Sequence, residues 1–313
     1  MIEEKRSSLL MTLIPALFVM ALWGSMFPMI KLGYSALEIS SDDIPSIILF
    51  AGARFVVGGG ILTLFTLVHE RGFKPMKRGD VSNILLGALF TIILHYTFNF
   101  IALALGEGSK TAIIKQISYL FLTCFAFTFD RSEHFSVYKI IAGVIGFLGI
   151  IATGIDGSSV TFRIGDFLVL LASISSAVGA IVSKRAATTM SPVKFVAYSQ
   201  LGGGILLFSA GLIMGGKITH IDTRGVLIFA YICAASLVSY LIWNLLLKSG
   251  SLSRLSLIKF TEPLFGVVLS GLILSEEIFK ISYLAALLLL LTAIIIEHLP
   301  DIRKRKAEET NDS

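Results

Sequence analysis

The sequence predicts an all-α membrane protein in which ten transmembrane helices form two inverted five-helix repeats. Three observations support this fold class: an apolar composition, ten apolar stretches of span length, and a match of the chain with itself at a constant shift. The 313 residues are 55% hydrophobic and only 15% charged, whereas charged residues make up about a quarter of a typical soluble domain. This composition excludes an ordinary water-soluble globule.

The apolar stretches set the predicted spans. A transmembrane helix needs about 20 consecutive, mostly apolar residues, and ten such stretches leave no room for a soluble catalytic domain. The first stretch is too long for a signal peptide and lacks a small-residue cleavage site, so we interpret it as a retained span. The predicted spans are residues 9–32, 45–68, 81–104, 110–129, 136–154, 165–184, 192–215, 225–247, 253–274 and 281–299.

The distribution of basic residues predicts that both termini lie in the cytoplasm. Of the 26 lysines and arginines, seventeen fall on the side of the N-terminus, six on the opposite side and three in the interior of the spans. Basic residues accumulate on the cytoplasmic side of membrane proteins. The net charge of +5 therefore reports orientation in a bacterial inner membrane and contact with membrane lipids, not nucleic-acid binding.

A shift of 144 residues aligns the chain with itself through four successive spans. Residues 58–62 (GGGIL) recur as residues 202–206, and the same register pairs Lys115 with Lys259. A constant register over this length indicates an internal duplication.

The duplication divides the chain into a first five-helix repeat, residues 9–154, a second, residues 163–299, and a basic cytoplasmic tail, residues 300–313. Because five is an odd number, the second repeat enters the bilayer from the opposite side. Inverted repeats are typical of secondary transporters, whose binding site lies near the midplane between the halves.

Four charged residues fall in the interior of the spans, away from their ends, and are the first candidates for a binding site: Arg54, Lys115, Lys259 and Glu262. A charge at this depth costs at least about 2.5–3.5 kcal/mol on insertion scales. Glu262 follows Lys259 by three residues, so the two can neutralise each other on one helical face. On span four no acid lies at that spacing from Lys115, so its charge needs a partner elsewhere, and a substrate carboxylate or phosphate would serve. The alternative is that the lysines snorkel to the headgroups.

Arg54 lies nine residues after Pro45, about 13 Å into the bilayer. This depth exceeds comfortable snorkelling reach, so the guanidinium must face protein or water. It either anchors the helix bundle or binds an anion.

Polar and aromatic residues within the spans complete the predicted substrate site. Each of them is alternatively a helix–helix contact or part of an interfacial belt. They are Trp23, Tyr96, Asn99, Ser118, Tyr119, Tyr240, Trp243 and Asn244.

Prolines and glycines predict local features of the helices. Pro28 and Pro263 remove backbone donors, so we expect kinks beside residues 23–25 and beside Glu262. The runs 58–60 and 202–204 predict close-packed seams between helices. A further glycine series in span five leaves a homodimer open.

Several short motifs follow one another along the chain: Trp23-Gly24-Ser25, Lys31, Arg54-Phe55, Glu262-Pro263, and the acids Glu133 and Glu277. In their order and spacing these motifs resemble the drug/metabolite transporter superfamily, EamA type. The resemblance covers residues 10–299 and implies a ten-span carrier for small metabolites.

The predicted function is secondary transport of a small anionic or zwitterionic metabolite, such as an amino acid or organic acid, by alternating access. Three embedded cations favour an anionic group over the alternative substrate, a lipophilic cationic drug exported by proton coupling through Glu262. Nucleoside or nucleotide-sugar transport and a passive channel remain open. An intramembrane enzyme would need clustered acid–base groups or metal ligands, which the spacing does not provide. We expect no enzyme activity, cofactor or metal.

Overall fold

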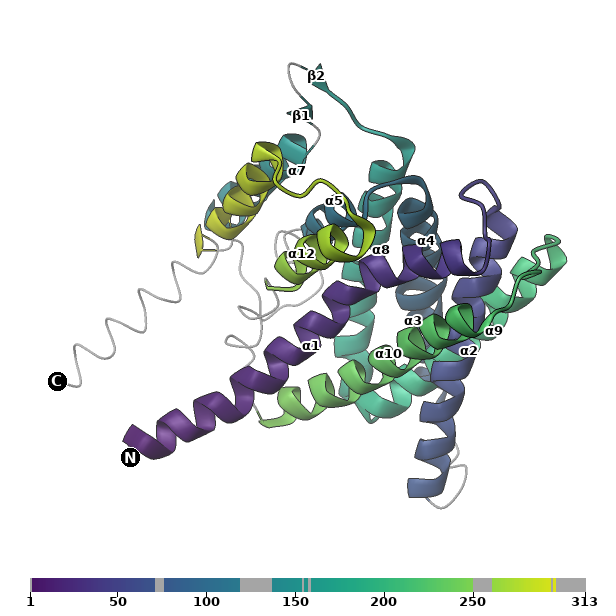
Figure 1. Cartoon of the computed structure of the whole chain (residues 1–313). Coiled ribbons are helices and arrows are strands. Elements are labelled where there is room, and N and C mark those ends of the chain that lie inside the picture. The colour runs from purple at the N-terminus through teal and green to yellow at the C-terminus, as the bar shows by residue number, and fades with distance from the viewer. Residues whose placement is uncertain are drawn as a thin grey trace.

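The computed structural model is a bundle of helices (Figure 1). It describes residues 2–70, 76–118, 137–153, 155–156, 159–249, 261–293 and 295–296. The α-helices are α1 (Ile2–Ala36), α2 (Ile44–His69), α3 (Arg78–Gly87), α4 (His95–Leu105), α5 (Gly108–Ile114), α7 (Val137–Thr153), α8 (Ile164–Ala187), α9 (Pro192–Ile213), α10 (Thr223–Ser249) and α12 (Glu262–Leu274).

Three smaller features complete the described chain. A π-helical segment, η1 (Ala88–Leu94), joins α3 to α4, and a further apolar helix covers Ile281–Ala293. Strands β1 (Ile155–Asp156) and β2 (Ser159–Val160) form a short antiparallel hairpin outside the spans. The predicted all-α membrane fold is confirmed.

The described helices agree with most of the predicted spans. Six are long and apolar enough to cross a membrane, and they correspond to predicted spans one, two, three, six, seven and eight. Shorter apolar helices fall on spans five, nine and ten. Span four differs, because α5 ends at Ile114 and a turn at Lys115 and Gln116 interrupts the predicted helix.

The outer face of α2 shows how these helices meet lipid. Leu64 and Val68 are 63% and 71% exposed, and Val57 and Ile61 are exposed beside them. Hydrocarbon chains are as apolar as these side chains, so the face suits a bilayer.

Helices α2 and α9 cross in close contact and run in opposite directions. Gly52 lies against the backbone of Phe208, whereas Gly59, farther along α2, lies against Leu201, nearer the start of α9. A Cβ atom at Gly52 would lie 2.2 Å from Phe208 N, and one at Gly59 would lie 2.4 Å from Leu201 N. Glycine therefore allows a backbone-to-backbone approach that larger residues would prevent.

The predicted glycine seams are confirmed only in part. Gly203 and Gly204, like Gly59, lie directly against neighbouring helices. A Cβ atom at Gly60 or Gly202 would meet no described atom within 4 Å. These two glycines lie on the far side of their helices, because three consecutive residues point in three directions around a helix.

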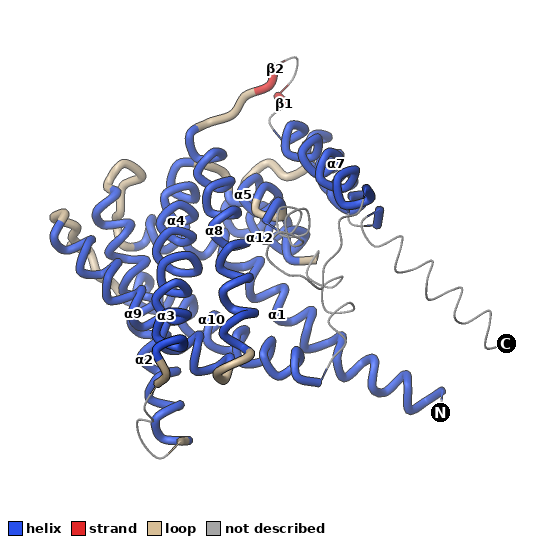
Figure 2. Tube along the Cα trace, turned by 180° about the vertical axis from the view of Figure 1, so that it is seen from behind, coloured by secondary structure: helices blue, strands red, loops and turns tan. Residues whose placement is uncertain are grey.

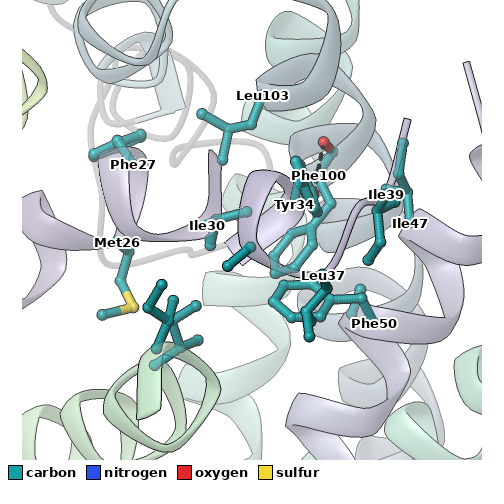
Figure 3. Close-up of a cluster of buried hydrophobic side chains, with 14 of the residues drawn as sticks. Met26, Phe27, Ile30, Tyr34, Leu37, Ile39, Ile47, Phe50, Phe100 and Leu103 are labelled. Atoms are coloured by element: carbon teal, nitrogen blue, oxygen red, sulfur yellow. Dashed lines mark hydrogen bonds between the residues drawn. The ribbon is translucent and has the colours of Figure 1, made fainter. Parts of the chain in front are cut away.

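Helix α1 runs beside α10 in both views and also contacts α12 (Figure 1, Figure 2). The largest buried cluster surrounds its C-terminal half and includes Phe27, Ile30 and Tyr34 (Figure 3). Tyr34 donates a hydrogen bond to the carbonyl of Phe100 at 3.0 Å, and its ring centroid lies 5.5 Å from that of Phe50. This cluster joins α1 to α2 and α4.

Helix α7 and the helix Ile281–Ala293 form a separate pair at the edge of the bundle (Figure 1). A Cβ atom at Gly149 would lie 3.2 Å from the carbonyl oxygen of Ala286. Leu290 is buried in the same cluster. The pair contacts the remaining helices through α5 and α12.

Candidate functional site

An ion pair joins the two predicted halves of the chain. Lys115 Nζ lies 3.0 Å from Glu262 Oε1, and the Lys115 ammonium also lies 5.2 Å from the centroid of the Phe27 ring. The Glu262 side chain is 3% exposed and that of Lys115 is 26% exposed. The sequence placed the partner of Lys115 outside its own helix, and in the described structure Glu262 supplies a carboxylate from the other half. The predicted pairing of Glu262 with Lys259 falls on a residue outside the described ones.

The local backbone explains how these two side chains meet. Lys115 directly follows α5, and its N–H still donates to the carbonyl of Thr111 at 3.0 Å. Glu262 is the first residue of α12, and Pro263 lies in the first turn, where a missing N–H leaves no helical hydrogen bond unmade. Pro263 thus lies in the first turn of α12, and the residues before 261 that the predicted kink would involve lie outside the described ones.

Gly24 brings α1 against the start of α12. A Cβ atom at this position would lie 2.6 Å from the Cβ of Phe265 and 3.0 Å from the carbonyl oxygen of Glu262. Helix α1 continues through Pro28. Gly24 thus allows close packing of the two helices beside the ion pair.

Aromatic side chains from three helices lie near one another. The Trp23 ring centroid on α1 lies 6.2 Å from that of Tyr240 and 5.4 Å from that of Trp243, both on α10. The side chain of Tyr240 hydrogen-bonds to Tyr96 of α4. Four of the predicted aromatic residues therefore form one connected group.

Arg54 is buried where α2, α4 and α10 meet. It is 4% exposed, and its Nη2 donates to Ser236 Oγ at 2.6 Å. Its guanidinium carbon lies 4.8 Å from the ring centroid of Phe55 and 5.2 Å from that of Tyr96. The guanidinium thus faces protein, as its depth in the sequence predicted.

The other predicted binding residues have different outcomes. Asn99 and Ser118 are both buried, and Asn99 Oδ1 has no hydrogen-bond donor among the described residues. The side chains of Tyr119, Lys259 and Asn244 lie outside what the structure describes. The predictions for these three residues stay predictions.

A second ionic group, at the C-terminal end of α1, was missed by sequence reasoning. Lys31 Nζ lies 2.9 Å from Glu276 Oε1. Glu276 also accepts hydrogen bonds from the backbone N–H groups of Gly108 at 2.9 Å and Ser109 at 3.0 Å. Burial raises the pKa of the Glu276 carboxyl, but the bonds from Ser109, Lys31 and Gly108 outweigh it and hold the pKa below its usual value.

Two more ion pairs join the predicted halves near the same end. Lys280 Nζ lies 3.3 Å from Glu107 Oε2, and Lys110 Nζ lies 2.8 Å from Asp166 Oδ2. All three pairs combine a residue before position 120 with one after position 160. They hold this end of the two halves together.

The acid quoted for the family resemblance, Glu277, is not the one that makes the described contacts. The 144-residue shift aligns Glu277 with Glu133, yet Glu277 is exposed and Glu276 makes the contacts. The sequence feature that could have indicated this ion pair was the positive charge of Lys31, because a lysine at the end of a span requires an acidic partner nearby.

Comparison with known proteins places the chain in a family. A model of the EamA-like transporter family matches residues 10–155 and 163–297. A probable amino-acid metabolite efflux pump of Escherichia coli (strain K12) is 28% identical over 289 residues, covering 88% of this chain and 91% of the relative. An uncharacterized transporter of Bacillus subtilis (strain 168), YvbV, is 26% identical over 285 residues, covering 89% and 88%.

The fold also has a solved counterpart. A crystal structure aligns with a TM-score of 0.64 and 17% sequence identity, covering 92% of this chain and 98% of the other. At that identity the likeness concerns the fold alone. The family and the named relatives are transporters and not enzymes. The protein is therefore a membrane transporter, and the chain belongs to the EamA-like transporter family.

Proposed function

We propose that the protein is a secondary carrier that moves a small anionic or zwitterionic metabolite, an amino acid or organic acid, across the bacterial inner membrane by alternating access. The two family matches, over residues 10–155 and 163–297, support a duplicated carrier. The antiparallel crossing of α2 and α9 is what two inverted repeats require of their second spans. The excess of basic residues on the side of the N-terminus supports cytoplasmic termini.

The ion pair between Lys115 and Glu262 is the observation that carries the choice of substrate. A zwitterion can enter this pair by placing its carboxylate on Lys115 and its ammonium on Glu262. One ion pair then becomes two, and the net charge of the buried site does not change. A zwitterion thus avoids the large cost of leaving a charge buried without a partner.

The position of the pair also suits a carrier. Lys115 and Glu262 come from opposite halves of the chain. Relative movement of the halves must therefore lengthen this ion pair or replace it with other partners. A bound substrate that holds both charges can lower the cost of that exchange. The connected aromatic group of Trp23, Tyr96, Tyr240 and Trp243 supplies apolar surface for the uncharged part of the substrate.

The name of one relative is consistent with this substrate class. The name of the Escherichia coli relative is probable amino-acid metabolite efflux pump, and export is accordingly the direction that we propose. A lipophilic cation is disfavoured as the substrate, because Lys115 already neutralises Glu262.

A matched ligand series tests the proposal. Purified protein is screened by thermal shift against amino acids, and uptake of the best ligand is measured in proteoliposomes. The hit is then compared with the carboxylic acid that lacks its amine and with the amine that lacks its carboxylate. We expect the wild type to bind the amino acid at least about tenfold more tightly than either, since each truncated ligand leaves one protein charge unpaired.

Two variants should separate the roles of the charges. Glu262→Gln should reduce the difference in affinity between the amino acid and the carboxylic acid. Lys115→Met should reduce the difference in affinity between the amino acid and the amine. Lys194→Met is the matched control, because Lys194 pairs with Glu70 away from this site. A wild type that binds quaternary amines but no amino or organic acid would refute the proposal in favour of cation efflux.

A further inference from the structure

Arg54 is a buried cation that has no carboxylate partner among the described residues. Its side chain is 4% exposed, and among the described residues no acid lies within ion-pair distance of it. The nitrogen atoms Nε and Nη1 are buried and donate to no acceptor in the described chain. Lys115, the other described cation in the interior of a span, has Glu262. Arg54 is therefore the embedded charge whose donors remain available to a ligand.

Three ring contacts surround the guanidinium without satisfying these donors. The guanidinium carbon lies 4.8 Å from the ring centroid of Phe55, 5.2 Å from that of Tyr96 and 5.6 Å from that of Phe100. Ring faces offset part of the positive charge, but they do not replace hydrogen-bond acceptors for the N–H groups at the edge of the guanidinium. Such an edge is the part of arginine that binds carboxylates in a two-bond geometry.

The Arg54 site connects with the ion pair of Lys115 and Glu262 through tyrosines. Tyr96, whose ring contacts Arg54, hydrogen-bonds to Tyr240. The Tyr240 hydroxyl lies within the electrostatic influence of both Arg54 and Glu262. Arg54 also bonds to Ser236, which belongs to the predicted second half. A substrate held at the ion pair therefore has a second positive group within the same interior region.

We propose that Arg54 binds a second carboxylate, the one in the side chain of an acidic amino acid. This inference rests on the proposed function, in which Lys115 and Glu262 hold the amino-acid head group. The single hydroxyl partner and the planar guanidinium suit a singly charged, planar carboxylate. A phosphate dianion would bring a second negative charge that one guanidinium does not balance. The substrate class is accordingly α-amino acids of the aspartate and glutamate type.

Glutamate and glutamine test this inference because they have nearly the same shape and differ in one charge. Affinities are measured for the wild-type protein, for Arg54→Gln and for Lys115→Met. We expect the wild type to bind glutamate at least about tenfold more tightly than glutamine. Arg54→Gln should reduce that ratio to about one while glutamine affinity changes less than about threefold. Lys115→Met should weaken both ligands to a similar degree, since both share the head group.

Several results would overturn the inference. Equal binding of glutamate and glutamine by the wild type does so without any variant, so the test does not depend on whether Arg54→Gln folds. An equal loss of both ligands in Arg54→Gln would show that Arg54 only anchors the helices. The affinities are also compared in gluconate and in chloride buffer. If the preference for glutamate disappears in chloride, the Arg54 site binds a halide and not the substrate carboxylate. If glutamine binds and glutamate gains nothing, only this inference fails; if no amino acid binds, the proposed function fails as well.

Discussion

Removing either member of the ion pair between Lys115 and Glu262 should have unequal effects on stability. In Lys115→Met, the Glu262 carboxylate, which is 3% exposed, loses the ammonium that balances it. Removing one partner of a buried ion pair costs about 3–5 kcal/mol. In Glu262→Gln, the remaining lysine is 26% exposed and has a long stem that can carry its ammonium toward water. We expect this change to lower the free energy of unfolding by only about 1–2 kcal/mol.

Thermal unfolding in detergent measures the difference. For a chain of this size, 1 kcal/mol corresponds to about 2 °C in Tm, so Lys115→Met should lower Tm by about 6–10 °C and Glu262→Gln by about 2–4 °C. The double variant removes both charges and should be more stable than Lys115→Met alone, because position 262 no longer holds a buried carboxylate without its partner. Equal single losses that add up in the double variant would refute the reasoning, since independent sites add and paired charges do not.

Two other predictions follow from the packing of α2 and from the ionic group at the end of α1. Gly52→Val should cost more than about 3 kcal/mol or prevent folding, because even a Cβ atom would lie 2.2 Å from Phe208 N; Gly60→Ala, on the open side of the same helix, should leave the size-exclusion profile unchanged. The lowered pKa of Glu276 means that its ionised form stabilises the fold at neutral pH, and that this stability is lost as pH falls below the usual value of 4.5. The Tm of Glu276→Gln should therefore lie below that of wild type at pH 7 and approach it in acid, whereas Glu277→Gln, a change at an exposed neighbour, should show no such difference.

For the candidate site, sequence reasoning selected residues by their depth in the membrane. Arg54, Lys115 and Glu262 were recognised because ionised groups are costly within a span. Their partners were not recognised. Periodicity reports neighbours on one helix, so it proposed Lys259 for Glu262, while the described structure brings Lys115 from 147 residues away.

The limits of the predicted elements have a similar cause. A bilayer demands about 20 apolar residues per span, so the transmembrane character and most span positions were readable from residue order alone. The turn at Lys115 and the choice of Glu276 over Glu277 were not. Both depend on which side chain faces a partner from a distant segment, and hydropathy has the same value whichever way a residue faces. Only the packed helices decide between such neighbours, because burial and pairing are properties of the assembled bundle.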